Sequence, residues 1–174
     1  MPNNPRIAIS RQSTQQSIEL TEGDLRAVLD RFLAELGFSD RVLSLLLADN
    51  RTLRELNLAH RGRDEPTDVL SWRYTEAEGH AAATPEAPEA PLLGDLAISL
   101  ERAREQAHRN GWNLRTEVLR LLAHGCAHLA GYDHNTAAAE REMLGREEAL
   151  LKAVGIEHVY PARENQPGGP SSGA

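Results

Sequence analysis

Apolar residues recur along this chain at two different spacings, which predict interleaved helices and strands. Helical spacing is clearest over residues 25–36, where the apolar side chains fall on one face of a helix. Thr21 and Asp24 precede this segment as a capping box, and Gly37 follows it as a stop. Four further helices are predicted. The first is capped by Asn50 and runs through Leu58, and the second and third cover Leu100–Asn110 and Asn113–Ala130. The last is capped by Thr136 and ends before Gly155.

Short apolar or alternating runs between these helices predict strands. The runs cover residues 6–10, 42–47, 68–74 and 93–99. Because strands and helices interleave, we expect an α/β or α+β fold built on a small mixed sheet, with α+β preferred.

Two stretches show neither the helical spacing nor the alternation of a strand. Thr75 to Pro91 is rich in Ala, Glu and Pro, and Asn165 to Ala174 is rich in Gly, Pro and Ser. We therefore expect a single domain over residues 1–164, with a flexible insertion at 75–91 and a disordered tail at 165–174.

Composition narrows the classes of function. The chain has 26 Asp and Glu against 19 Lys and Arg, so its formal net charge of −7 argues against charge-driven coating of nucleic acid, DNA included. A single cysteine excludes an internal disulfide, and the chain has no run of about 18 apolar residues that would span a membrane. With no signal pattern in residues 1–10, we expect a cytoplasmic protein.

The segment with the clearest chemistry is His124-Gly-Cys-Ala-His128-Leu-Ala-Gly131-Tyr-Asp-His134. Two histidines four residues apart share one face of a helix, and Gly131 can end that helix so that the chain returns His134 to them. Three imidazoles that leave a fourth position open suit a catalytic Zn²⁺, although Ni²⁺ and Cu²⁺ also accept such ligands.

The spacing matches the zinc-protease pattern H-E-x-x-H-x-x-G-x-x-H with one departure. Gly125 stands where those enzymes carry the glutamate that acts as general base. Since glycine cannot move a proton, the peptide-cleaving machinery is absent. Cys126 and Met143 are predicted to be core residues.

Three segments together resemble the YbeY family of bacterial endoribonucleases, also described as rRNA maturation factors. They are N-L-A-H-R (57–61) leading to P-T-D-V-L-S-W (66–72), L-G-D-L-A-I-S (93–99), and the histidine segment above. The resemblance covers about Asn50 to Gly155. Three positions depart from the family pattern. His60 replaces an aromatic residue, which could change the position of the Arg61 side chain. Trp72 replaces Phe and Ala127 replaces Leu, and both changes should affect packing only.

The resemblance implies that His124, His128 and His134 bind the metal and that Arg61 acts beside it. It also implies a four-stranded mixed sheet packed by about five helices. The substrate that the resemblance implies is single-stranded rRNA. The implied role is maturation of the 16S rRNA 3′ end and ribosome quality control. The implied partners are the small ribosomal subunit or its assembly proteins. Cleavage of a phosphodiester builds negative charge, which Zn²⁺ and a guanidinium can stabilise.

Other polar residues near these motifs have two interpretations each. Arg63 and Arg73 either line the RNA path or are solvated surface residues. Asp133 either holds a ligand imidazole or forms a turn. Asp68 and Asp95, expected at strand starts, either act as a general base or fix loop backbone, and the second is favoured.

Two other functions stay open at the level of sequence. One is a zinc peptidase, against which Gly125 counts. The other is a non-enzymatic ribosome-assembly factor with a structural metal, which the acidic net charge favours slightly and the histidine-only ligand set disfavours. Attack by water and attack by the 2′-hydroxyl of the RNA are both compatible with the residues present.

Overall fold

The computed structural model describes residues 6–12, 18–74, 80–81, 90–157 and 159. The predicted tail at 165–174 and most of the predicted insertion lie outside the described residues. The statements below concern the described part of the chain.

A mixed sheet forms the base of the molecule, with its strands in the order β1-β2-β5-β3. Strands β1 (Ile7–Arg11), β2 (Val42–Ala48) and β5 (Ala90–Ser99) are parallel, and β3 (Val69–Arg73) joins β5 in the antiparallel sense. The two-residue strand β4 (His80–Ala81) pairs with the first residues of β5. The predicted four-stranded mixed sheet is confirmed.

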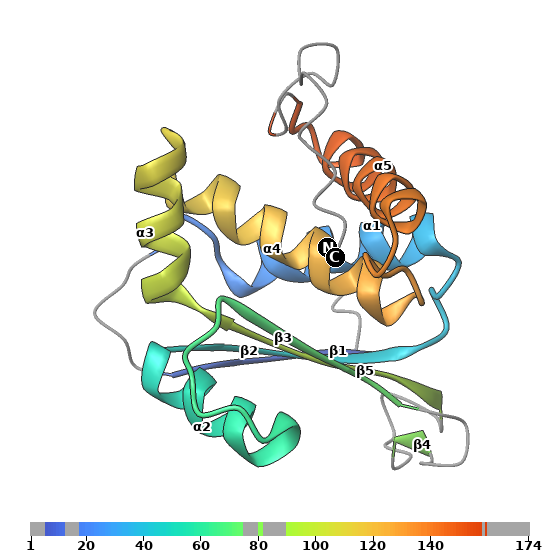
Figure 1. The fold of residues 1–174 in the computed structure, drawn as a ribbon. Helices are drawn as coiled ribbons and strands as arrows, with labels where there is room; N and C mark the ends of the chain where they lie inside the picture. The colour runs from blue at the N-terminus through green and yellow to red at the C-terminus, as the bar shows by residue number, and fades with distance from the viewer. Residues whose placement is uncertain (1–5, 13–17, 75–79, 82–89, 158, 160–174) are drawn as a thin grey trace.

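Five helices pack on the two faces of this sheet in the described residues. They are α1 (Glu22–Leu36), α2 (Asn50–Arg61), α3 (Leu100–Asn110), α4 (Leu114–Leu129) and α5 (Ala137–Ala153). Helix α2 lies on one side of the sheet, whereas the other four lie on the opposite side, with α4 running across the strands (Figure 1). The α+β class is therefore confirmed.

Local capping explains why most helices begin where the sequence predicts. The Thr21–Asp24 capping box is formed at α1, and Asn113 and Thr136 cap α4 and α5 through their side-chain oxygens. At α2 the prediction was wrong by one residue, because Asp49 and not Asn50 accepts the N–H of Thr52.

Helix α2 buries Leu53 as its apolar pattern suggests, but not Leu58. Leu58 is 49% exposed, whereas Asn57 is only 3% exposed. The helix continues to Arg61 and ends at Gly62, which adopts a left-handed φ of 68°. Arg61 therefore lies in the last helical turn and not in the following loop.

Strand β5 begins three residues earlier than predicted, at Ala90. Asp95 consequently lies in the middle of the strand, opposite Trp72 of β3, and not at a strand start. Gly94 allows β3 to approach, because a Cβ at this position would lie 2.1 Å from the backbone oxygen of Trp72.

The main core lies between the sheet and the four helices on its α4 side. Helix α4 contributes most to it, and the largest apolar residues of α1 and of the sheet pack there too. Cys126 and Met143 are buried, as predicted. A smaller apolar cluster of Ala48, Leu53, Leu70 and Ala97 packs under α2 on the other face.

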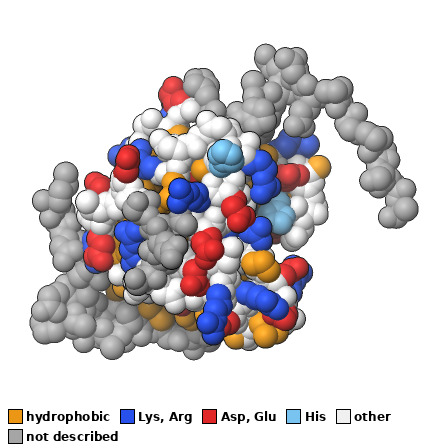
Figure 2. Space-filling view, turned by 90° about the vertical axis from the view of Figure 1, so that its left-hand side faces the viewer, with side chains coloured by type: hydrophobic (Ala, Val, Ile, Leu, Met, Phe, Trp, Pro, Cys, Tyr) orange, Lys and Arg blue, Asp and Glu red, His pale blue; other side chains and the backbone are white. Residues whose placement is uncertain are grey.

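The surface carries charges of both signs. On the face shown in Figure 2, acidic and basic side chains alternate and do not form a field of one sign. Among the described residues, no helix combines the length and the apolar character needed to cross a membrane.

Candidate metal centre

The last two turns of α4 carry His124 and His128 on the helix face that is turned toward solvent. Both side chains are partly buried. Gly125, between them in sequence, is fully covered on the sheet side: a Cβ there would lie 2.7 Å from Leu96 Cδ2 and 3.5 Å from Val69 Cγ2. Position 125 therefore faces the sheet, and a glutamate side chain would have no space there.

A tight reversal after α4 returns the chain to these histidines. The backbone N–H groups of Ala130, Gly131 and Tyr132 donate to carbonyls of the last helical turn, and Gly131 adopts a left-handed φ of 100°. A residue with a side chain is strained at such a φ. The turn delivers the exposed His134 beside the α4 pair.

The three imidazoles lie close enough to share one ion. Their possible ligand nitrogens are all within 4.8 Å of one another. The ring of His128 meets those of His124 and His134 edge-on, at centroid distances of 4.7 and 5.3 Å. The three side chains form a group that can hold a metal ion, and a set made only of imidazoles fits Zn²⁺ with a further position free.

A fourth residue, which the sequence analysis did not identify, contacts this cluster. Glu147 of α5 is 1% exposed, and its Oε1 lies 2.6 Å from Nδ1 of His124. The signal was present in the sequence, because Glu147 interrupts the apolar face that Met143, Leu150 and Leu151 form on α5. A carboxylate at such a position requires a partner.

The surroundings of α4 also change the proton affinity of its side chains. Burial lowers the pKa of His128, and the neighbouring His124 and His134 lower it further, against an opposing effect of a backbone hydrogen bond at Tyr132 and of the Glu147 charge. His128 is therefore neutral at neutral pH, the form in which an imidazole can bind a metal ion. Burial raises the pKa of the Cys126 thiol to about 12, so this residue is a protonated core group.

The three predicted arginines lie on different elements of the fold. Arg61 donates from Nη2 to the carbonyl of Ser71 on the edge strand β3, at 3.3 Å. Arg73 lies two residues further along that strand, and its Nη1 would be 3.0 Å from a Cβ at Gly131. Its guanidinium therefore contacts the turn between His128 and His134, while Arg63 is exposed in the loop after α2.

The loop that follows Arg61 is held by the buried Asn57. The Asn57 side-chain amide donates to the backbone carbonyl of Glu65 at 3.0 Å, and the backbone carbonyl of Asn57 accepts from the N–H of Arg63. Asn57 thus fixes the backbone around Arg61 and Arg63.

The two aspartates considered as general bases have hydrogen-bond partners within the fold. Asp68 accepts from the Val69 N–H at 2.8 Å and from the Gln106 amide at 3.0 Å. Asp95 accepts from the Tyr74 hydroxyl at 2.5 Å. These contacts agree with the structural interpretation that was favoured for both.

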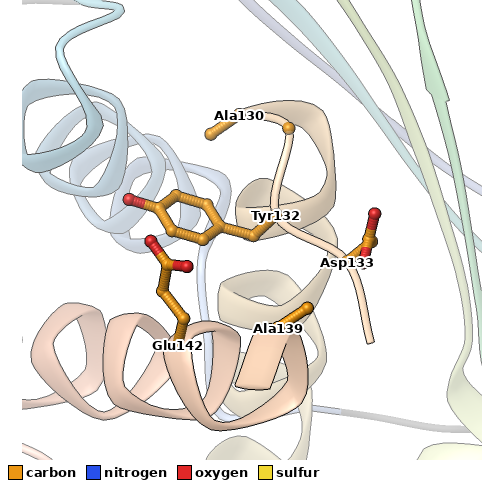
Figure 3. Close-up of a pocket in the computed structure, with 6 residues that line it drawn as sticks. Ala130, Tyr132, Asp133, Ala139 and Glu142 are labelled. Atoms are coloured by element: carbon orange, nitrogen blue, oxygen red, sulfur yellow. The ribbon is translucent and has the colours of Figure 1, made fainter. Parts of the chain in front are cut away.

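Asp133 precedes His134 in the turn, and its Oδ1 accepts from the N–H of Asn135 at 3.1 Å. This contact is that of a turn-forming residue. A hollow of about 280 Å³ lies between the end of α4 and the start of α5, and Asp133 is among the residues that line it, together with Tyr132 and Glu142 (Figure 3).

A larger groove of about 740 Å³ lies on the α2 face of the sheet. It is lined by His60, Trp72, Tyr74 and Asp95, among others, and the rings of His60 and Trp72 are 4.9 Å apart. His60 thus packs as an aromatic residue would. Because residues of one strand alternate between faces, Trp72 and Asp95 point away from α4 and its histidines.

The fold and this centre define an α+β protein with a three-histidine site of the type that binds a metal ion. Comparison with known proteins makes the assignment more specific. The family described as Endoribonuclease YbeY matches residues 7–155, and the chain belongs to that family.

Individual relatives agree with this assignment. Proteins named Endoribonuclease YbeY are 40% identical in Sulfurihydrogenibium sp. (80% of this chain, 85% of the relative) and 34% identical in Acetivibrio thermocellus (83% and 90%). The solution structure of TM1509 from Thermotoga maritima, 22% identical, shares the fold with a TM-score of 0.55 over 85% of this chain and 88% of that one.

Proposed function

We propose that this protein is a metal-dependent endoribonuclease that cleaves single-stranded RNA beside His124, His128 and His134. The observation that carries the proposal is the convergence of three imidazoles within 4.8 Å in a chain of this family. The relatives are named for endonucleolytic cleavage of RNA, and the geometry supplies a site that suits such chemistry.

The donor set favours Zn²⁺ as the ion. Nitrogen ligands alone, with one of the three on an exposed turn, resemble a catalytic site and not a closed structural one. When bound, such an ion supplies Lewis-acid polarisation of a phosphoryl oxygen. His128 can bind the ion without first releasing a proton, because burial lowers its pKa.

Arg61 and Arg73 are the groups that would grip the scissile phosphate. Both guanidiniums are associated with the edge strand β3, one through the Ser71 carbonyl and the other against Gly131. A planar guanidinium pairs with two phosphate oxygens and stabilises the charge that develops during cleavage. Arg63, two residues after Arg61, would contact a neighbouring phosphate.

The geometry disfavours the peptidase alternative. A general base at position 125 would have to face the metal, but this position faces Leu96 and Val69 of the sheet. Asp68 and Asp95 are held by partners within the fold, so neither replaces the missing glutamate.

The cellular substrate proposed is the 3′ end of 16S rRNA, with a role in ribosome quality control. This assignment rests on the family resemblance of the motifs around Arg61, Asp95 and the histidines. Binding to the small ribosomal subunit or to one of its assembly proteins would bring an acidic chain to RNA that it does not attract by net charge.

Cleavage of an unstructured RNA oligonucleotide tests the proposal. We expect a chelator to abolish cleavage and added Zn²⁺ to restore it. Arg61→Ala should lower kcat about 10²–10³-fold, the effect of removing one donor to a developing negative charge. Arg51→Ala is the matched control, because Arg51 is an 86% exposed side chain at the start of the same helix.

Parental cleavage by a folded Arg61→Ala variant, or cleavage that resists chelation, would contradict the proposal. A fluorogenic peptide assay run in parallel tests the peptidase alternative. The end groups of the RNA products distinguish the two nucleophiles, because attack by the 2′-hydroxyl leaves a cyclic phosphate and attack by water does not.

A further inference from the structure

Glu147 is a carboxylate on the buried face of α5. It is 1% exposed, and Met143 and Leu150, one turn away on either side, are buried apolar residues. A charged group at such a position costs free energy unless it is paired. An apolar side chain would pack there at lower cost, so stability alone does not account for a glutamate.

The Glu147 carboxylate is directed at the metal-binding cluster. Its Oε1 lies 2.6 Å from Nδ1 of His124, which is the length of a strong, charge-assisted hydrogen bond. The Nδ1–H group of His124 donates to it, since a carboxylate can only accept. The lone pair of the neutral ring is then on Nε2, the nitrogen left to bind an ion.

We propose that Glu147 is a positioning residue for the metal centre: it fixes His124 in the tautomer and ring orientation that offer Nε2 to the ion, and its charge strengthens that ligand. The inference rests on the proposed function, because it requires the three histidines to bind a metal. It assigns α5, which supplies none of the three histidines, a direct part in metal affinity.

A purely structural role would have a different signature. If Glu147 only joined α5 to α4, its replacement by an apolar residue of similar length would weaken the fold and leave intrinsic metal affinity unchanged. If it positions His124, Glu147→Met should leave the metal-free protein folded, because the His124 side chain that loses its partner is 27% exposed and can donate to water instead. The same variant should bind metal more weakly.

The experiment measures Zn²⁺ affinity by competition with a chromophoric chelator, for the full chain and its variants. We expect Glu147→Gln and Glu147→Met to bind Zn²⁺ about 10–100-fold more weakly than the parent, the usual effect of losing such a partner. Glu148→Gln is the matched control: its side chain is the next along α5 and is exposed, and its affinity should equal that of the parent.

A ring-nitrogen NMR spectrum of the metal-free protein provides the second readout. His124 should be protonated at Nδ1 in the parent, and this preference should be lost in Glu147→Met. Parental affinity in both Glu147 variants, or an unchanged His124 tautomer in Glu147→Met, would overturn the inference.

The same titration separates the two levels of the argument. If His134→Ala abolishes binding while both Glu147 variants bind as the parent does, the positioning role fails and the metal centre stands. If the parent binds no Zn²⁺, the proposed function fails and the positioning role fails with it.

Discussion

Each imidazole of the cluster has two ring nitrogens, and the contacts of the ring decide which of them can bind a cation. For His124 the buried Glu147 carboxylate at 2.6 Å makes that choice. For His128, half-burial beside two other imidazoles keeps the ring neutral. His134 is the most exposed of the three, so its position depends on the turn at Gly131.

The exposure of His134 makes it the best residue with which to test metal binding without disturbing the core. Zn²⁺ at 100 times its dissociation constant should stabilise the parent by about 2.7 kcal/mol. For a chain of this size that amounts to a rise in Tm of roughly 5–10 °C. In His134→Ala the rise should disappear, while the Tm without metal should stay close to that of the parent.

Differential scanning calorimetry with and without Zn²⁺ checks this prediction. His108→Ala is the control, because His108 is an exposed histidine on α3 outside the cluster. It should keep the full rise in Tm. A rise of the same size in His134→Ala would mean that Zn²⁺ binds elsewhere.

At the level of the elements, α4 and β3 can approach strand β5 closely because Gly125 and Gly94 have no side chains. Gly94 lets the Trp72 carbonyl approach, and Gly125 lets α4 settle on Leu96. Gly145 in α5 differs from both, because it is exposed and a Cβ there would meet no atom within 4 Å.

Alanine substitution should therefore have opposite effects at these positions. Gly94→Ala should lower the free energy of unfolding by at least about 3 kcal/mol, because its Cβ would meet backbone that cannot move aside. Gly125→Ala should cost less, because the tip of a leucine can shift. Gly145→Ala should raise the free energy of unfolding by about 0.5–1 kcal/mol, since alanine is the better helix former.

Urea denaturation of the three variants measures this series. The order Gly145→Ala, Gly125→Ala, Gly94→Ala from most to least stable is the expected result. A neutral Gly94→Ala variant would show that β3 does not approach β5 as closely as described.

A polar network links α3, α4 and the loop before β3. Glu117 is fully buried, accepts from the Trp112 indole at 2.7 Å and pairs with Arg120 at 2.6 Å. Arg120 reaches Gln106, which in turn donates to Asp68. The network thus holds the start of α4 relative to the strand that carries Arg73.

Removing Glu117 should destabilise the fold strongly. Glu117→Ala removes the buried carboxylate that pairs with Arg120 and accepts from the Trp112 indole, and breaking such a buried pair typically costs about 3–5 kcal/mol. Glu105→Ala is the control, because its ion pair with Arg102 is surface-exposed and is worth at most about 1 kcal/mol. Chemical denaturation curves with similar midpoints for the two variants would contradict this account.

The elements that the sequence predicted well are those fixed by neighbouring residues. The capping box at Thr21, the cap at Thr136 and the left-handed Gly37 require only local contacts, and the structure has all of them. The three histidines could also be grouped, because one helix and one turn bring them together.

What the sequence did not reveal depends on contacts between distant residues. The start of β5 at Ala90 reflects pairing with β2 and β4. The burial of Asn57 in place of Leu58 follows from how α2 lies on the sheet. Glu147 acts on a histidine 23 positions earlier, across two packed helices, and no local pattern specifies that partner.

At the scale of the whole molecule, the net charge does not attract RNA. The net charge is −7, and the face in Figure 2 mixes both signs. RNA would therefore be held by a few local guanidiniums, of which Arg61, Arg63 and Arg73 are the candidates. Such a protein should bind RNA with a weak dependence on salt.

The expected slope of log Kobs against log salt concentration is about −2, from roughly three phosphates at 0.7 each. Fluorescence anisotropy with a labelled single-stranded RNA over a range of KCl concentrations measures it. Arg61→Ala should reduce the slope by about 0.7, whereas Arg51→Ala should not change it. A slope several times steeper would indicate a broad basic surface that these three arginines do not account for.

The order of the parts along the chain has a consequence for synthesis. Strand β2 gains its β5 neighbour only after Ser99 has been made, and the histidines and Glu147 follow later still. A nascent polypeptide that ends before residue 147 holds Arg61 and the imidazoles without the carboxylate that orients them. On the proposed function, translation itself delays the nuclease: the ribosome making the chain must pass residue 147 before the centre that cuts RNA can assemble.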